Sequence, residues 1–391
     1  MDILIVGAGL GGLTAAAVLQ QRGHRVRVFE QAPQLGEVGA GIQLSANAMK
    51  VLDVVGIRPA LLRAGVRPQS WDFRRFDTGE LLHRLPLGDA HEDAFGAPYL
   101  QLHRADLHAA LQQVVLSHDT TGMMLDARAI AITEREDCVQ VFFDGGRVAE
   151  ADLVIGADGL RSLVRRHVIG DDEPQFTGQV AWRCTVPAER IAPQGFTPDR
   201  CTVWCGPGRH AAIYALRVGR LVNFVGCVER PDEGESWTAR RPWAELDADY
   251  GGWHPDVRAV IEQVDRDQCF RWSLNNRQPS LRWSSERITL LGDAVHATLP
   301  YLAQGAALAI EDAAVLVRAL ELPLPLPDQL RRYESARAPR AARVVQESSR
   351  MAALYHLADE AAMRDSFSQE DLTRSRNEWI YAFDPWKVPL S

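Results

Sequence analysis

The chain has 391 residues, 46% of them hydrophobic, and a formal net charge of −8 at pH 7. This length is enough for two or three domains around a large core, and the acidic balance argues against nucleic acid as a general partner. No apolar run reaches the roughly twenty residues needed to span a bilayer. The first expected strand begins almost at Met1, which leaves no room for a signal peptide. We therefore expect a soluble cytoplasmic protein without a membrane partner.

The first thirty residues predict a strand, a glycine turn, a helix and a second strand that ends in an acid. The turn places Gly7 at the tight bend, Gly9 where the backbone can approach a pyrophosphate, and Gly12 where the helix packs on the sheet. Glu30 follows at about the spacing expected for an acid that holds a ribose hydroxyl. A carboxylate there would repel a 2′-phosphate, so this segment favours FAD or NAD over NADP without deciding between them.

The elements that follow continue an α/β pattern. Residues 45–55 and 104–116 have apolar residues at helical spacing, and 127–153 reads as strands with a turn at 144–146. A further buried strand ends in a glycine turn at Gly156-Ala-Asp158-Gly159.

The composition then changes to that of an antiparallel sheet. Alternating patterns run from 179 to 227, and residues 71–100 are expected to add strands to the same sheet. Residues 231–275 read as helical. The α/β pattern returns with a buried strand that ends at Gly292-Asp293 and a helix over 303–322.

These patterns predict an α/β fold, in which a Rossmann-like FAD-binding domain is interrupted by a mixed, mainly antiparallel sheet domain that binds substrate, with C-terminal helices. The expected boundaries are 1–70, 101–178 and 276–350 for the FAD-binding domain, 71–100 and 179–275 for the sheet domain, and 351–391 for the C-terminal helical segment.

The cysteines and the basic segment 331–350 do not indicate a functional site. The six cysteines are scattered without the spacing of a zinc site, so we expect free thiols and no metal. The basic segment 331–350 reads as a solvated helix face, because its charges alternate with Ala and Val.

The three glycine turns, at 7–12, 156–159 and 292–296, share one pattern of a buried strand followed by glycine with an acid nearby. Taken in order, they resemble the single-component FAD-dependent aromatic hydroxylases, which have the p-hydroxybenzoate hydroxylase fold. The resemblance covers essentially the whole chain. It implies an FAD site made of Gly7, Gly9, Gly12, Glu30, Arg104, Asp158, Asp293, Gly305 and Ala306. The usual His-Pro is His296-Ala297 here, so no chemical role is assigned to His296.

The resemblance also implies the reaction. Such enzymes hold a C4a-hydroperoxyflavin in a dry pocket beside an electron-rich ring, with O2 and a small aromatic substrate as reactants. Only one dinucleotide fingerprint is present, so NADH or NADPH is expected to bind transiently, reduce FAD and leave.

His210 and Tyr214 are the expected catalytic pair. They are four residues apart in an apolar strand, so both side chains point to one face of the sheet. His titrates near neutrality and can take a phenolic proton, while the Tyr hydroxyl can relay it. A satisfied pair in the sheet core is the alternative interpretation.

The remaining substrate contacts do not decide the ring system. The His/Tyr spacing with Cys201 resembles 6-hydroxynicotinate 3-monooxygenase, whereas Gln43 and Tyr301, beside Pro300, look more like 3-hydroxybenzoate 6-hydroxylase and salicylate hydroxylase. Cys201 reads as a packing residue rather than a nucleophile. For a substrate carboxylate, Arg183 and Arg209 are candidates. These four contacts, Gln43, Cys201, Pro300 and Tyr301, form the expected substrate site.

The function expected is therefore an NAD(P)H-dependent flavoprotein monooxygenase that hydroxylates a phenolic or hydroxypyridine carboxylate, with or without loss of the carboxyl group. The alternatives are a monooxygenase of the same fold for a larger polyketide or antibiotic-like substrate, an NAD-binding dehydrogenase, and a flavin redox protein without aromatic turnover. The sequence does not decide whether the chain forms a homodimer.

Overall fold

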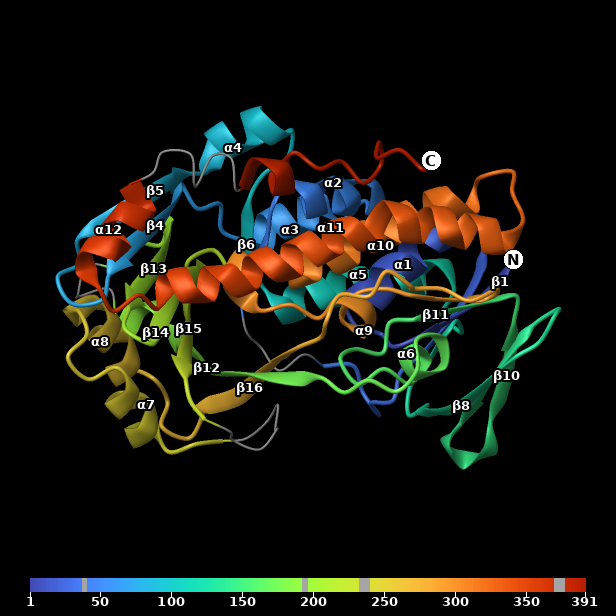
Figure 1. The fold of residues 1–391 in the computed structure, drawn as a ribbon, viewed down its shortest axis with the longest axis horizontal. Coiled ribbons are helices and arrows are strands. Elements are labelled where there is room, and N and C mark those ends of the chain that lie inside the picture. Colours follow the sequence, from blue (N-terminus) through green and yellow to red (C-terminus); the bar gives the residue numbers. More distant parts are fainter. Residues whose placement is uncertain (37–40, 192–195, 232–239, 369–376) are drawn as a thin grey trace.

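The computed structural model describes residues 1–36, 41–191, 196–231, 240–368 and 377–391. An α/β part and a part built on a large sheet lie at opposite ends of the long axis, and one long helix runs past both (Figure 1). Part of the 231–275 segment, residues 232–239, lies outside the described residues. The α/β class with mixed sheets and C-terminal helices is confirmed.

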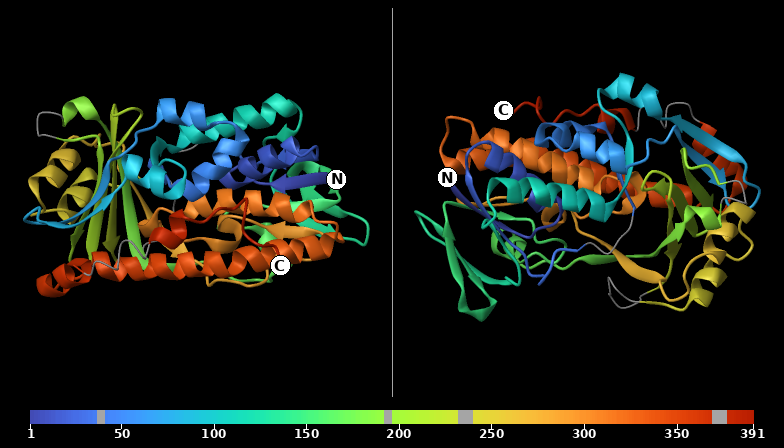
Figure 2. Two further views of the ribbon diagram at one scale, coloured as in Figure 1. Left: turned by 90° about the horizontal axis from the view of Figure 1, so that it is seen from above. Right: turned by 180° about the vertical axis from the view of Figure 1, so that it is seen from behind.

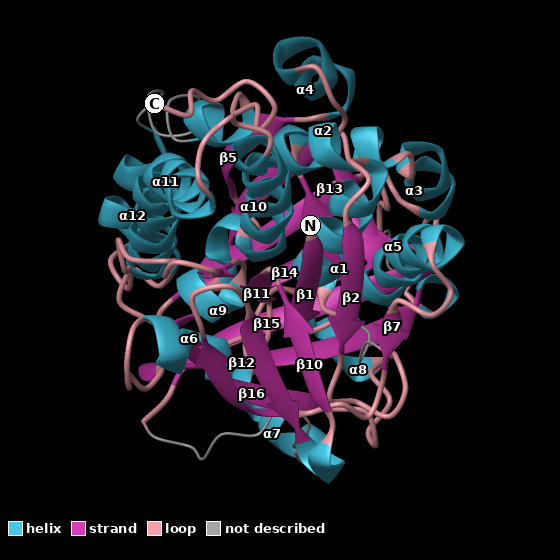
Figure 3. Ribbon diagram, turned by 90° about the vertical axis from the view of Figure 1, so that its right-hand side faces the viewer, coloured by secondary structure: helices cyan, strands magenta, loops and turns pink. Residues whose placement is uncertain are grey.

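The α/β part is built on a parallel sheet with the strand order β17-β11-β1-β2-β7. Its strands are β1 (Asp2–Val6), β2 (Arg25–Phe29), β7 (Met123–Met124), β11 (Leu153–Gly156) and β17 (Ile288–Leu290). Helices α1 (Leu10–Gln21), α5 (Arg104–His118) and α10 (Gly305–Leu320) lie on one side. The smaller sheet of β8 (Ala129–Glu134), β9 (Val139–Phe143) and β10 (Val148–Ala151) lies on the other (Figure 3).

The second part is a seven-stranded sheet with the order β16-β12-β15-β14-β13-β4-β5. Its strands are β4 (Ser70–Arg75), β5 (Leu81–Pro86), β12 (Gln175–Pro187), β13 (Arg200–Gly206), β14 (Arg209–Leu216), β15 (Leu221–Glu229) and β16 (Phe270–Asn276). The expectation that the inserted segment after residue 70 joins this sheet is confirmed by β4 and β5. The helical interpretation of 231–275 is wrong at its end, because β16 pairs there with β12.

The two faces of the seven-stranded sheet pack against different parts of the chain. One face, which we call the outer face, buries Trp182, Ile213 and Phe224 against helices α7 (Trp243–Asp249) and α8 (Pro255–Glu262). The opposite, inner face carries Trp71, Phe73, Cys201, Cys205, Tyr214 and Cys227. It packs against the C-terminal part of the chain, including Tyr355, Phe367 and Tyr381.

Helix α11 (Leu326–Tyr355) is the longest element and connects the two parts (Figures 1 and 2). It begins beside the α/β part and ends against the inner face. The boundary expected at residue 350 therefore falls within this helix. The basic segment 331–350 is not a fully solvated face, because Arg337 is 0% exposed.

The remaining elements connect or cover the two parts. They are α2 (Ala46–Val55), α3 (Arg58–Ala64), α4 (Gly88–Phe95), α6 (Leu163–Val168), α9 (Asp293–His296), α12 (Glu360–Ser368) and the antiparallel pair β3 (Gly41–Leu44) and β6 (Leu100–His103). Within the described ranges, no helix combines the length and apolarity needed to cross a membrane.

Candidate functional site

Of the three glycines that define the first turn, Gly7 and Gly12 are closely packed and Gly9 faces open space. Gly7 has a φ of +105°, and a Cβ there would lie 2.4 Å from the Ala157 carbonyl oxygen. A Cβ on Gly12 would lie 2.1 Å from the Gly7 carbonyl oxygen. A Cβ on Gly9, by contrast, would meet no described atom within 4 Å. The absence of side chains at Gly7 and Gly12 therefore allows the strand and the helix to pack closely, while the backbone at Gly9 is open to a ligand.

Glu30 lies at the same turn. Its two carboxylate oxygens accept hydrogen bonds from the backbone N–H groups of Ala8 at 2.8 Å and Ala32 at 2.9 Å. Helix α1 begins directly after Gly9, with no side-chain cap among the described residues and no acid in its first turn. An uncapped N-terminus beside open backbone suits a pyrophosphate, so these residues fit the ADP portion of FAD.

Asp158, in the second turn, binds the start of a helix, whereas Gly9 in the first turn faces open space. Its carboxylate accepts hydrogen bonds from the Leu163 N–H at 2.7 Å, the Val164 N–H at 3.2 Å and the Ser162 hydroxyl. Burial raises the pKa of this carboxyl, while the hydrogen bonds oppose the shift. Asp158 thus fixes the start of α6 at the carboxyl end of β11, next to the first turn.

The other predicted FAD residues lie at helix starts. Asp293 is exposed at the first position of α9, and Arg104 is the first residue of α5. Gly305 and Ala306 open α10, whose N-cap residue Gln304 provides no side-chain cap in the part described. The positive end of a 16-residue helix therefore remains available for an electron-rich ligand edge.

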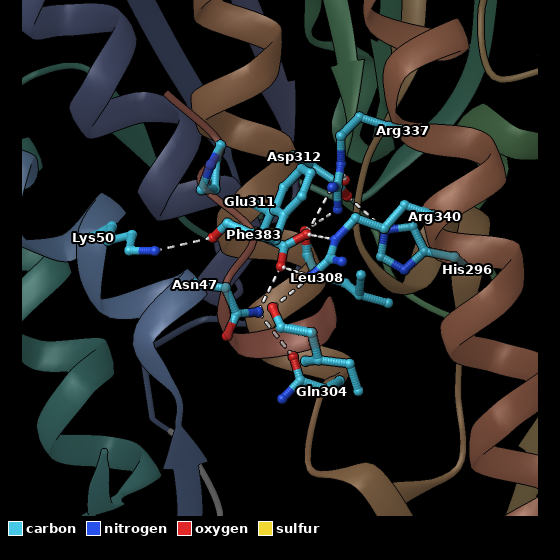
Figure 4. A network of polar contacts seen from close by, with 12 residues as sticks. Asn47, Lys50, His296, Gln304, Leu308, Glu311, Asp312, Arg337, Arg340 and Phe383 are labelled. Atoms are coloured by element: carbon cyan, nitrogen blue, oxygen red, sulfur yellow. Dashed lines mark hydrogen bonds and ion pairs between the residues drawn. The ribbon is translucent and has the colours of Figure 1, made fainter. Parts of the chain in front are cut away.

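A buried network of charges fixes the start of α10 (Figure 4). The amide of Asn47 donates to Gln304 Oε1 at 2.9 Å and to Glu311 Oε1 at 2.5 Å. Glu311 also pairs with Arg337 at 2.6 Å and Arg340 at 2.8 Å, both from α11. These contacts join helices α2, α10 and α11 next to the first turn of α10.

Asp312 extends this network to the third glycine turn. Its carboxylate accepts from the Gly292 N–H at 2.9 Å, contacts His296 Nε2 at 2.5 Å and pairs with Arg337 Nε at 2.7 Å. His296 is 3% exposed and Asp312 is 0% exposed. His296 therefore acts in holding the Gly292-Asp293 turn to α10.

The structure places His210 and Tyr214 on the inner face of β14. Directly opposite them in the neighbouring strand β13 lie Cys205 and Cys201, the latter inferred from the register in which Thr202 faces Ile213. The two side chains nonetheless have different neighbours. His210 contacts Tyr301 and Tyr355, with ring centroids 4.8 and 5.2 Å apart.

Tyr214 lies at the other end of the strand, beside β3. A Cβ on Gly41 would lie 2.5 Å from the Tyr214 hydroxyl, so the first residue of β3 must be very small. The Gly41 N–H donates to Asn223 Oδ1 at 2.9 Å, which holds β3 against β15.

Gln43, also on β3, is the centre of a buried polar cluster. Its Oε1 accepts from Trp71 Nε1 at 2.9 Å and from the Tyr99 hydroxyl at 2.8 Å. Its Nε2 donates to Cys201 Sγ at 3.7 Å. Two predicted substrate residues, Gln43 and Cys201, are therefore in direct contact. Pro300 begins a short 3₁₀ turn, Pro300–Leu302, in which Tyr301 donates to Gln179.

Burial favours the neutral forms of the titratable side chains around His210 and Tyr214. It lowers the pKa of His210 well below 6.5, and the neighbouring His356 lowers it further. It raises the pKa values of Tyr214 and Cys201, and raises that of Cys227 to about 12. We expected His210 to titrate near pH 7, but its lowered pKa means that the imidazole stays uncharged at that pH.

The two arginines considered for a carboxylate lie on opposite faces. Arg209 donates to the Asp249 carbonyl of α7, on the outer face. Arg183 lies on the inner-face side of β12 and stacks over Trp272, 3.9 Å from the ring centroid. A surface cavity of about 540 Å³ lies elsewhere, between α5 and the β14–β15 turn, lined by Ala64, Asp106, Arg217, Arg220 and Leu221.

Comparison with known proteins identifies the class of cofactor-binding protein to which this chain belongs. A family model described as an FAD binding domain matches residues 1–348. The solved structure of Klebsiella pneumoniae HpxO complexed with FAD and uric acid superimposes with a TM-score of 0.86 at 26% identity, covering 100% of this chain and 98% of that one. The fold and the first turn thus define an FAD-binding flavoprotein.

Curated relatives narrow the class. The 3-amino-4-hydroxybenzoate 2-monooxygenase of Streptomyces cremeus is 40% identical, covering 97% of this chain and 94% of that protein. The 6-hydroxynicotinate 3-monooxygenase of Bordetella bronchiseptica is 38% identical, covering 99% and 96%. The chain belongs to the FAD-dependent aromatic hydroxylases and is a monooxygenase, which confirms the resemblance inferred from the three turns.

Several residues that shape the site were not found from the sequence. Arg337 and Asp312 are fully buried partners, and His356 contacts His210 from 146 residues away. One usable signal existed for the network: the adjacent acids Glu311 and Asp312 interrupt an otherwise apolar stretch, 305–317, of a helix, and buried acids require partners. No local pattern marks His356.

Proposed function

We propose that the protein uses NADH or NADPH and O2 to hydroxylate a small aromatic acid with a ring hydroxyl, either a phenol or a hydroxypyridine. The observation that carries the proposal is the inner face, where neutral His210, Tyr214 and the Gln43 cluster lie buried together. The names of the two relatives above support the substrate class, because both describe aromatic acids with a ring hydroxyl or its tautomer.

In this proposal His210 is the base. A neutral imidazole can accept the proton of a ring hydroxyl, and the phenolate that results is more reactive toward an electrophile. Tyr214 remains protonated because burial raises its pKa, so its hydroxyl can donate a hydrogen bond to the substrate oxygen.

Arg183 is the proposed partner of the substrate carboxylate. It shares the inner face with His210 and Tyr214, while Trp272 supports its guanidinium plane. Arginine suits this role because its planar fork can bind a carboxylate with two hydrogen bonds.

The cofactor residues complete the proposal. Gly9 and the start of α1 would bind the pyrophosphate of FAD, Glu30 a ribose hydroxyl, and Asp293, Gly305 and Ala306 the flavin half. When bound, FAD supplies the redox chemistry that activates O2. Cytoplasmic location and the formation of a homodimer remain predictions.

The test uses the purified holoenzyme and a matched panel: 3-amino-4-hydroxybenzoate, 6-hydroxynicotinate, 3-hydroxybenzoate and salicylate, each beside its analogue without the ring hydroxyl. We expect at least one hydroxylated acid to accelerate NADH or NADPH oxidation and to gain one oxygen by mass spectrometry, with evolved CO2 measured to detect loss of the carboxyl group. If no aromatic acid accelerates oxidation while FAD is fully bound, the proposed substrate class is wrong.

A further inference from the structure

Three titratable side chains form a continuous line that leads away from the inner face. His210 Nδ1 lies 2.8 Å from His356 Nε2, and His356 Nδ1 lies 2.8 Å from Glu229 Oε1. Each contact is within hydrogen-bonding distance. The three residues come from β14, from the position after α11 and from the end of β15.

Exposure changes sharply along this line. His210 is 4% exposed and the His356 side chain only 2%, whereas the Glu229 side chain is 54% exposed. The line therefore starts at a buried base and ends in a carboxylate that reaches solvent.

The backbone holds the two outer members in place. The Gly208 N–H donates to the His356 carbonyl at 3.2 Å, and the Gly208 carbonyl accepts from the Glu229 N–H at 2.9 Å. Gly208 has a φ of +65°, which favours glycine at the tip of the β13–β14 turn. One residue thus fixes both His356 and Glu229 beside β14.

The contacts define a consistent set of tautomers. The Glu229 carboxylate accepts a hydrogen bond, so His356 carries its proton on Nδ1 and offers Nε2 as an acceptor to His210 Nδ1–H. His210 Nε2 is then the acceptor left for another group, and it has no hydrogen-bond partner among the described residues.

We propose that His356 and Glu229 form a proton relay that connects His210 to solvent. The proposal rests on the proposed function. The substrate O–H bond breaks, its electron pair stays on oxygen as phenolate, and the proton bonds to His210 Nε2. The Nδ1 proton of His210 passes to His356 Nε2, the Nδ1 proton of His356 passes to Glu229, and Glu229 releases it to water. Return of a proton to the product oxygen follows the same path in reverse.

The groups that surround the line do not compete for the proton. His210 faces Tyr301 and Tyr355 from neighbouring segments and Cys205 and Cys227 from adjacent strands. Burial raises the pKa values of Tyr301, Cys205 and Cys227. At His356, burial and the nearby Arg209 lower the pKa and Glu229 raises it, so Glu229 is the group that draws a proton outward.

The experiment compares holoenzymes in which the relay is interrupted. His356→Gln, His356→Ala and Glu229→Gln are mixed with a panel substrate under anaerobic conditions in weak buffer, with phenol red reporting proton release. In this mixture we expect His356→Gln to slow proton release by about tenfold or more. When the flavin is then reduced and O2 is added, single-turnover hydroxylation should slow to a similar degree, and Glu229→Gln should have a smaller effect on both rates. Added imidazole should restore the rate of His356→Ala, because it can occupy the vacated position and carry the proton.

Two controls separate the outcomes. Glu150→Gln removes an exposed, hydrogen-bonded carboxylate on the distant β10 and should leave proton release unchanged. A wild-type protein that hydroxylates no panel compound would overturn the proposed function itself. Wild-type hydroxylation together with normal rates and a normal pH profile in both His356→Gln and Glu229→Gln would overturn the relay alone. A folded His356→Ala that imidazole does not restore would also count against it.

Discussion

At the scale of single residues, the state of His210 has a consequence for the pH dependence of the reaction. A base is competent above its pKa, and burial lowers the pKa of His210 well below 6.5. We therefore expect the rate of the hydroxylation step to stay constant as pH falls from about 8 to about 6, where a solvent-exposed histidine would become protonated. Single-turnover rates across this range check the prediction, and a decline centred near 6.5 would contradict it.

Removal of the same side chain should separate catalysis from cofactor binding. We expect His210→Ala to slow hydroxylation by about 10²-fold, because a general base contributes roughly that much, while FAD affinity stays near that of the wild type. The loss should be smaller for a substrate whose hydroxyl is already ionised. Rates and flavin titrations measure the two effects, and parallel loss of both would assign His210 a structural role.

The glycines of the first turn offer a matched pair of substitutions. Gly9 has a φ of −70° and an open Cβ position, so Gly9→Ala should keep the fold and weaken FAD binding. In Gly12→Ala the new Cβ would collide with the Gly7 carbonyl, and we expect a loss of about 1–3 kcal/mol in the free energy of unfolding. Urea unfolding of the apoprotein and flavin titration distinguish them. Equal destabilisation by both substitutions would show that the space at Gly9 is not available.

At the scale of elements, the start of α2 depends on a histidine from α4. His91 Nε2 accepts a hydrogen bond from the Ala46 N–H at 3.3 Å, and burial lowers the pKa of His91 to about 4. The unfolded chain binds a proton at about pH 6.5 but the folded one does not until about pH 4, so stability must fall as pH drops through this window.

The size of this effect can be measured by substitution. We expect the stability of the wild type to decline between about pH 6.5 and 4 more steeply than that of His91→Asn, by up to about 1.4 kcal/mol per pH unit. The exposed His118, at the end of α5, provides the control substitution His118→Asn. Identical slopes for the wild type and His91→Asn would show that His91 does not titrate in this way.

Elements with a strong local pattern were predictable from the sequence. The strand, turn and helix of residues 2–21 follow from a short apolar run and fixed glycines, and α10 follows from an almost unbroken helical pattern. Strand β16 was missed because its state depends on pairing with β12, nearly a hundred residues earlier. The burial of Arg337 and the contact of His356 with His210 were missed for the same reason: their partners are distant in sequence.

At the scale of the whole molecule, the network in Figure 4 should contribute to overall stability because it joins α2, α10 and α11. Arg337→Met would leave Glu311 and Asp312 partly uncompensated in the interior, at a cost of about 3–5 kcal/mol. Arg331→Met, on the same helix, removes an exposed pair with Asp328 and should cost about 0–1 kcal/mol. Chemical denaturation of both variants measures the difference, and similar losses would contradict the assignment.

The division of the seven-stranded sheet into two faces bears on how such a protein can evolve. The outer face packs its own cluster of buried side chains, including Trp182 and Phe224, against helices α7 and α8, and this cluster is separate from that of the inner face. A substitution on the inner face therefore alters one of the two clusters that pack on these strands and leaves the side chains of the other in place. In our proposal the substrate lies on the inner face, so its surroundings can change while α7 and α8 keep the same contacts.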